Sequence, residues 1–198
     1  MQTEGAHLTV GHEGRTTNRP PAITFRQFQR SESDFAAIMD FGTDERVTRF
    51  LHFDLFRCRD DAVRFIDTFV LPHPWFRFIC LSGAGDQPVG MVVLRPEDTG
   101  GGRRRVSLGY SVAPELWGRG IATEAAKMMI EVAFEQWSGV DRVQTLVMLD
   151  NPASQRVLEK AGFQREAVLR KYMIFKGQIR DLVMYSFLST DRRLSHHD

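Results

Sequence analysis

Two stretches of this 198-residue chain carry side chains suited to holding a ligand, and the first is Trp117–Glu124. Its sequence, Trp-Gly-Arg-Gly-Ile-Ala-Thr-Glu, falls where a predicted strand gives way to a predicted helix. Gly118 and Gly120 can adopt backbone angles that other residues avoid, and they let a ligand approach the main chain closely. The first turn of a helix leaves N–H groups unpaired and partly positive, so this corner suits a pyrophosphate.

A tight strand-to-helix turn, in which glycine relieves strain, explains the same residues equally well. Two common nucleotide-binding motifs are excluded at this corner. No Gly-Lys-Ser/Thr follows at the spacing of a P-loop, and the dinucleotide pattern Gly-x-Gly-x-x-Gly is absent. A different phosphate-bearing ligand is therefore indicated.

The second stretch runs from Asn151 to Phe163. Asn151 suits a helix N-cap, Pro152 suits the first helical position, and Gly162 suits the end of the helix. Ordinary capping accounts for these residues without any ligand. A functional role requires that this stretch and Trp117–Glu124 face the same crevice.

Composition excludes several classes of protein. The net charge of +1 argues against a general nucleic-acid binder, although Arg103–Arg105 leaves RNA association open as a weak alternative. Cys58 and Cys80 form no close-spaced motif, so neither a metal site nor a disulfide framework is predicted. No apolar run is long enough to span a membrane and none resembles a signal peptide. We therefore expect a cytoplasmic protein, with nuclear access left open.

Apolar periodicity predicts a mixed α/β domain built on one mostly antiparallel sheet. The expected strands are 23–26, 76–81, 88–94, 104–112, 142–149, 166–175 and 181–188, and the expected helices are about 32–42, 43–50, 60–71, 120–137 and 152–161. The helices between the first two strands should form one wall of a cleft that contains His52 and His73. Residues 1–22 and 189–198 are predicted to be flexible tails around a single domain, 23–188.

Taken together, Leu108-Gly-Tyr110, Trp117–Glu124 and Asn151–Phe163 resemble the GNAT acetyltransferases. The chain is most similar to the branch typified by the ribosomal-protein N-terminal acetyltransferases RimJ and RimL, and residues 169–188 resemble that branch too. The resemblance covers about 23–188. It implies a GNAT fold, a bulged strand that splays from its neighbour, and acetyl-CoA as cosubstrate. It also implies transfer of the acetyl group to a primary amine, first of all a protein or peptide N-terminus.

The resemblance assigns the cosubstrate to specific positions. The family's phosphate loop begins with Gln or Arg, whereas this chain has Trp117, and Arg119 could compensate for the lost polar group. Asn151 would hold the pantetheine amide, and Ser154 would lie near the sulfur. The full set of implied cofactor-binding residues is Val112, Gly118, Arg119, Gly120, Ile121, Ala122, Thr123, Asn151 and Ser154.

Acetyl transfer to an amine needs a proton acceptor, a donor for the leaving thiolate and stabilisation of the oxyanion. Ser154 is the predicted thiolate donor, Glu166 the predicted base, and Tyr110 a further candidate beside the acetyl group. Each residue also has a purely structural explanation: Ser154 as a residue of the capped helix, Glu166 as a carboxylate on an edge strand, and Tyr110 as a packing residue.

Two rival functions stay open from sequence alone. One is acetylation of a small-molecule amine, because acceptor loops vary most on such a scaffold. The other is a catalytically silent CoA-binding sensor or interaction protein. This alternative stays open because Trp117 stands where the family's phosphate loop has Gln or Arg. The oligomeric state, monomer or homodimer, is also left open.

Overall fold

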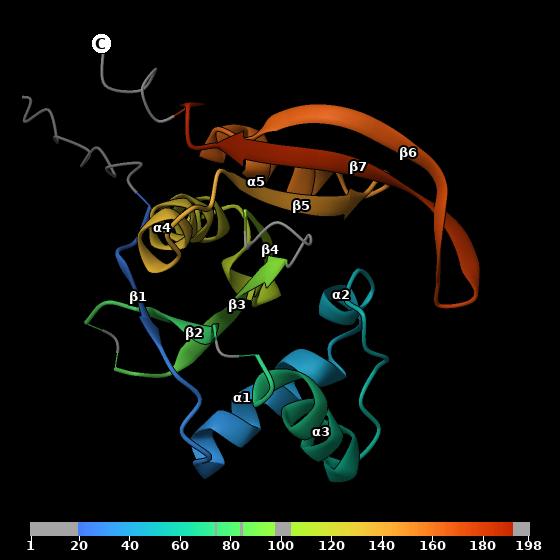
Figure 1. The fold of residues 1–198 in the computed structure, drawn as a ribbon. Helices are drawn as coiled ribbons and strands as arrows, with labels where there is room; N and C mark the ends of the chain where they lie inside the picture. Colours follow the sequence, from blue (N-terminus) through green and yellow to red (C-terminus); the bar gives the residue numbers. More distant parts are fainter. Residues whose placement is uncertain (1–19, 74, 84, 98–103, 192–198) are drawn as a thin grey trace, which may run out of the picture.

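A single seven-stranded sheet organises the computed structural model, which describes residues 20–73, 75–83, 85–97 and 104–191 (Figure 1). The strand order is β1-β2-β3-β4-β5-β7-β6. The strands are β1 (Ile23–Arg26), β2 (Phe76–Leu81), β3 (Pro88–Glu97), β4 (Arg105–Val112), β5 (Arg142–Met148), β6 (Gln164–Phe175) and β7 (Gln178–Leu188). The helices are α1 (Glu32–Thr43), α2 (Glu45–Thr48), α3 (Arg59–Phe65) with the π turn η1 (Ile66–Val70), the 3₁₀ turn η2 (Pro114–Leu116), α4 (Ile121–Gln136) and α5 (Pro152–Ala161). The predicted mixed α/β class is confirmed.

The sheet opens between β4 and β5. These strands pair in parallel only over Arg105–Ser107 and Arg142–Gln144. Beyond that point β4 stays with β3 as far as Val112, and β5 stays with β7 as far as Met148. The expected splayed pair is therefore present. The expected bulge is not found in the pairing of β4 with β3, which keeps an unbroken register from Gly90–Val112 to Glu97–Arg105.

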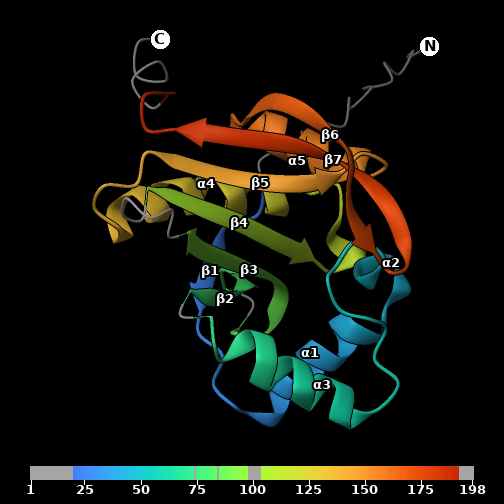
Figure 2. The same ribbon diagram turned by 45° about the vertical axis from the view of Figure 1, so that its right-hand side comes forward.

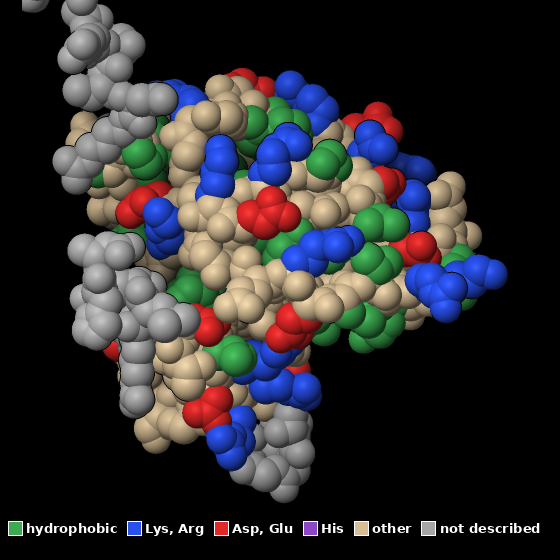
Figure 3. All heavy atoms as spheres, turned by 90° about the horizontal axis from the view of Figure 1, so that it is seen from above, with side chains coloured by type: hydrophobic (Ala, Val, Ile, Leu, Met, Phe, Trp, Pro, Cys, Tyr) green, Lys and Arg blue, Asp and Glu red, His purple; other side chains and the backbone are tan. Residues whose placement is uncertain are grey.

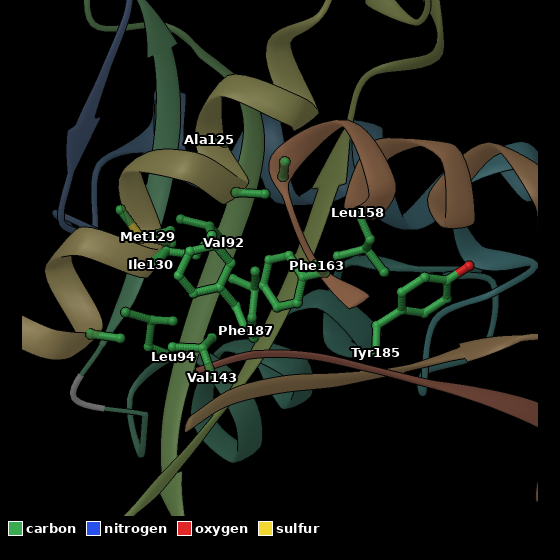
Figure 4. Close-up of a cluster of buried hydrophobic side chains, with 14 of the residues drawn as sticks. Val92, Leu94, Ala125, Met129, Ile130, Val143, Leu158, Phe163, Tyr185 and Phe187 are labelled. Atoms are coloured by element: carbon green, nitrogen blue, oxygen red, sulfur yellow. The ribbon is translucent and has the colours of Figure 1, made fainter. Parts of the chain in front are cut away.

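Helices cover both faces of the sheet (Figure 1). The face under α4 and α5 holds the larger core, where Met129 and Leu158 pack on Val92, Val143 and residues of β7 (Figure 4). The opposite face carries α1, α2 and α3, whose apolar side chains form a separate aromatic-rich cluster with β2. Burial of each large aliphatic side chain contributes about 1.5–3 kcal/mol, so the two clusters hold the sheet between them.

Local signals set the helix ends largely as predicted. Ser31 caps α1 by accepting from the Asp34 N–H, and Gly162 ends α5 in the left-handed conformation. The first helix was predicted to end at about residue 42, but Gly42 lies inside the last turn of α1. An added Cβ at Gly42 would lie 1.9 Å from the Phe56 ring, so this glycine provides room for packing and does not act as a cap.

A buried ion pair joins α1 to β1. Asp34 is fully buried and accepts from Arg26 at 2.6 and 3.0 Å and from the Gln29 N–H at 2.7 Å. Burial opposes ionisation of Asp34, yet the hydrogen bonds from Arg26 and Gln29 keep the pKa of its carboxyl below the ordinary value.

Asp34→Asn is expected to lower the free energy of unfolding by about 2 kcal/mol, because Arg26 loses a charged partner inside the fold. Urea unfolding at pH 7 measures this change. Asp40→Asn, on the exposed side of the same helix, is the matched control and should unfold like wild type. Equal midpoints for the two variants would show that the Arg26–Asp34 pair contributes nothing.

No helix in the described residues is long and apolar enough to cross a bilayer. The same residues contain no group of three or more His, Cys, Asp and Glu side chains placed to hold a metal ion. On the face seen in Figure 3, basic side chains are scattered among acidic and uncharged ones. Of the arginine run, Arg104 pairs with Asp141 and Arg105 with Glu97, while Arg103 lies outside the described residues.

Candidate active site

The glycine corner has the backbone geometry that its sequence predicts. Gly118 and Gly120 have φ of 77° and 81°, the left-handed region that favours glycine. Gly120 is the N-cap of α4 and has no capping side chain, so the first-turn N–H groups receive no side-chain cap. Gly118 and Arg119 are exposed, Ala122 and Thr123 are half-buried, and Ile121 is buried in the core. The corner can therefore present main-chain donors to a phosphate while Ile121 anchors it.

Trp117 ties this corner to the end of β4. Its indole Nε1 donates to the Val112 carbonyl at 2.7 Å, while 53% of the residue stays exposed. The aromatic residue at this motif position thus makes a specific main-chain contact. Val112, expected to bind the pantetheine arm, consequently has its carbonyl already engaged by the protein.

At the splay, Tyr110 of β4 meets the start of α5. The Tyr110 hydroxyl donates to the Ser154 main-chain carbonyl at 3.2 Å. Burial raises the pKa of Tyr110, so its phenol keeps its proton throughout the neutral range. Asn151 caps α5 by accepting from the Ser154 N–H at 3.1 Å. The capping explanation of Asn151 therefore holds, and its amide nitrogen is the group left to bind a ligand.

A cavity of about 1000 Å³ lies on the face of the sheet that carries α1–α3 and reaches the splay. Tyr110, Asn151, Ser154 and Glu166 all line it. Its other walls are aromatic residues of the loop after α2 and of α3, together with side chains of β3, β5 and β7. The structure thus brings the predicted catalytic residues to one cavity, while Gly118–Thr123 lie outside its lining.

Glu166 is held by two partners. Arg142 donates to both of its carboxylate oxygens, at 2.7 and 2.6 Å, and the Ser186 hydroxyl donates at 2.6 Å. Mainly because of the Arg142 hydrogen bonds, the pKa of Glu166 falls to about 2. A carboxylate with this pKa stays ionised but is a weak proton acceptor, so the pair with Arg142 limits what Glu166 can contribute as a base.

The Glu166 pair makes stability depend on pH. The folded pKa of about 2 lies below the ordinary 4.5, so the pair stabilises the fold fully above pH 4.5 and this stabilisation is lost as the pH falls toward 2. Glu166→Gln should therefore lower the urea midpoint most at pH 7, with the difference from wild type shrinking in acid. Glu135→Gln, on the exposed face of α4, should show no such trend. A constant difference across pH would contradict the ion-pair explanation.

Sequence reasoning missed a row of polar side chains along the cavity floor. Gln144 donates to both Glu97 oxygens, at 3.2 and 3.1 Å, and accepts from Arg142 at 2.7 Å. The Ser107 hydroxyl also donates to Glu97. The row therefore continues from β3 through β4 and β5 to Glu166. The sequence signal for this row was the pair Arg142 and Gln144, because two polar residues with a spacing of two lie on the same face of an otherwise apolar strand.

The two cleft histidines differ in position. His52 lines the cavity, with its ring edge-on to Phe175 at 5.6 Å between centroids. Burial, and secondarily the cations Arg95 and Lys176, lower the pKa of His52. His73 lies outside the cavity lining, and its Nδ1 contacts the Phe69 carbonyl at the end of the π turn.

The splayed sheet, the left-handed glycine corner and the facing cavity define an acyl-CoA-dependent transferase. The chain belongs to the GNAT acetyltransferase family, whose domain model matches residues 22–164. It is therefore an acetyl-CoA-dependent N-acetyltransferase that acts on an amine. The glycine corner and the open splay fit the pyrophosphate and the pantetheine arm of acetyl-CoA.

Relatives agree with this assignment. The uncharacterized N-acetyltransferase YoaA of Bacillus subtilis is 30% identical over 170 residues, which cover 81% of this chain and 90% of YoaA. The [ribosomal protein uS5]-alanine N-acetyltransferase of Escherichia coli is 29% identical over 84 residues, covering 42% of this chain and 43% of that enzyme. The spermidine N-acetyltransferase of Vibrio cholerae, solved with CoA and spermine, shares the fold with a TM-score of 0.68 at 18% identity, covering 85% of this chain and 96% of that one.

Proposed function

We propose that this chain acetylates the N-terminal amine of a protein or peptide, as the RimJ/RimL-like branch of the family does. The observation that carries the proposal is the cavity of about 1000 Å³ that meets the splay at Tyr110 and Ser154. Its volume is at the upper end of the range for small-molecule sites, so it leaves room for an acceptor beside the acetyl-bearing end of the cosubstrate. The partial similarity to the ribosomal uS5-alanine enzyme supports the same acceptor class.

Each site residue has a proposed task. Main-chain N–H groups of Gly118–Thr123, with Arg119, hold the pyrophosphate, and Val112 and Asn151 hold the pantetheine amides. Bound acetyl-CoA supplies the activated acetyl group. Tyr110 keeps a proton on its hydroxyl oxygen for the departing sulfur, with Ser154 as the second candidate donor. Glu166 stays the proposed base, acting on the amine directly or through water, with its basicity limited by Arg142.

Acetylation of a small amine is the second candidate. The fold neighbour from Vibrio cholerae, crystallised with spermine, favours this acceptor class because it builds a polyamine site on a similar scaffold.

Calorimetry with acetyl-CoA, followed by a screen for CoA release, tests the proposal. The screen compares peptides with free N-termini against spermidine and other small amines. We expect micromolar cosubstrate binding and faster turnover with peptides. Faster turnover with polyamines would favour the small-amine alternative. Binding without transfer to any amine would indicate a silent CoA-binding protein.

A further inference from the structure

Three arginines line the cavity, and two of them are neutralised. Arg142 is paired with Glu166 at 2.6 Å, and Arg105 lies 3.4 Å from Glu97. Arg95, on β3, lines the same cavity, is exposed to solvent, and has no ion-pair partner among the residues that the structure describes. An unmatched guanidinium in a substrate cavity is suited to an anionic group of the substrate.

His52 lines the same cavity as Arg95, and a second cation, Lys176, lies outside that lining. The tip of the β6–β7 hairpin reaches the loop after α2, where Lys176 Nζ donates to the Thr48 carbonyl at 2.8 Å (Figure 2). Both Arg95 and Lys176 act on His52 strongly enough to disfavour its protonation. We call Arg95 and Lys176 the cationic cluster.

The acidic groups nearby do not cancel this cluster. Asp54 lies 4.0 Å from Lys176, but it is outside the lining of the cavity that holds Arg95. Glu97 faces the cavity two residues beyond Arg95, but it already accepts from Ser107 and Gln144 and faces Arg105. The local field of the cavity wall is therefore positive.

The cluster is close to the expected site of transfer. Arg95 pairs with Ser107 of β4, and Ser107 pairs with Gln144 of β5 at the point where the two strands separate. Neighbouring strands are about 5 Å apart and each residue rises about 3.3 Å, so Arg95 lies one strand over and about 10 Å along the sheet from Tyr110, where transfer is expected. An amine at the splay can thus place a second group, a few bonds away, against Arg95.

We propose that the acceptor amine carries a carboxylate that binds Arg95, with Lys176 as a further positive charge on this side of the site. This inference rests on the proposed amine acetylation and narrows its substrate class. The carboxylate has two possible sources: the α-carboxylate of an amino acid, or an acidic side chain close to a peptide N-terminus. A polyamine, which bears only positive charge, is disfavoured at this wall.

Two matched acceptor pairs test the inference. The peptide pair is Ala-Asp-Ala-Ala and Ala-Asn-Ala-Ala, both amidated at the C-terminus, and the amino-acid pair is L-phenylalanine and its amide. We expect the acidic member of one pair to have a kcat/KM at least about tenfold higher, as a charge-assisted hydrogen bond provides. Arg95→Gln should remove this preference through KM, and Arg95→Lys should restore part of it. The pair that responds identifies the source of the carboxylate.

Arg57→Gln is the control, because Arg57 is exposed and lies outside the cavity lining. It should keep the preference. Calorimetry of the four acceptors with the CoA complex gives a readout that does not depend on turnover. Equal affinities and rates within both pairs, or a preference that survives Arg95→Gln, would overturn the inference. If the acidic acceptors bind through Arg95 but none is acetylated, the inference stands and the proposed function fails.

Discussion

Gly120→Asp is expected to weaken acetyl-CoA binding by about a thousandfold. Gly120 has φ of 81° directly before α4, where the main-chain donors of the proposed pyrophosphate site begin. A carboxylate there would lie roughly 5 Å from the phosphates, where each pair of like charges costs about 3 kcal/mol at an effective dielectric constant of about 20. Two phosphate charges, partly screened by solvent and Arg119, give roughly 4 kcal/mol, which corresponds to about a thousandfold in affinity.

Gly120→Asn is the matched control for this charge. Asparagine and aspartate have nearly the same shape, and both tolerate left-handed backbone better than other residues with a side chain. Either side chain also meets Pro20, since an added Cβ would lie 3.0 Å from the Cβ of that proline. Calorimetry with acetyl-CoA and a thermal unfolding scan measure both variants. Equal binding losses for Asp and Asn would show that shape, and not the charge of a bound pyrophosphate, determines the effect.

Gly139→Asn separates strain from function. Gly139 also has a left-handed φ, 84°, and an added Cβ would meet no atom within 4 Å. The substitution should therefore have a similar backbone cost at a place remote from the ligand. Acetyl-CoA affinity unchanged from wild type is the expected result. A loss of affinity there would mean that general destabilisation explains the Gly120 variants.

The glycine corner could be predicted because its signals are local. Left-handed glycines, a helix start and a buried Ile121 all lie within a few residues, so short-range backbone preferences determine them. The α5 caps at Asn151 and Gly162 were predictable for the same reason. The role of Trp117 was not, because its indole partner is the carbonyl of Val112 across the 3₁₀ turn. A motif position shows which residue is unusual, but not what that residue contacts.

The polar row on the cavity floor could not be predicted, since it depends on the register of five strands. Glu97 reaches Gln144 because two strand pairings are aligned. In the first, β3 pairs with β4 so that Pro96 lies opposite Val106, and in the second, β4 pairs with β5 so that Val106 lies opposite Val143. Such alignments combine residues far apart in sequence, and a one-residue slip would turn each side chain to the other face. Glu166 was predicted as a base from its family position alone. Its pair with Arg142 became visible only with the fold.

The two ends of the site therefore differ in how strongly the protein constrains them. The cosubstrate side is made of main chain, whose donors are positioned by α4 and by the indole of Trp117. The acceptor side is made of side chains from the six strands β2 to β7, the loop after α2, and α3 with its π turn. Relatives can keep the first and exchange the second, which explains why one fold serves ribosomal proteins and polyamines in different enzymes.

Tyr110→Phe is expected to lower kcat by about a thousandfold, within the range for loss of a positioned acid. The Tyr110 hydroxyl lies at the splay, donates to the Ser154 carbonyl at 3.2 Å, and retains its proton because burial raises its pKa. The raised pKa makes Tyr110 a weaker acid, so its proton must turn from the Ser154 carbonyl to the departing sulfur and be transferred as negative charge develops there. Phenylalanine keeps the ring and its packing, so acetyl-CoA affinity by calorimetry should change little.

Ser154→Ala separates the two candidate donors. The contact that Tyr110 makes is with the main-chain carbonyl of Ser154, which alanine retains, and the cap at Asn151 uses the Ser154 N–H. The variant should therefore lose only the serine hydroxyl and keep the geometry of the splay. We expect kcat within about threefold of wild type, whereas loss of a positioned acid lowers the rate by about a hundredfold or more. The opposite result, a large loss of kcat in Ser154→Ala and a small loss in Tyr110→Phe, would assign the acid role to the serine. Removal of the group that protonates the sulfur should lower kcat strongly, and removal of the other hydroxyl should not.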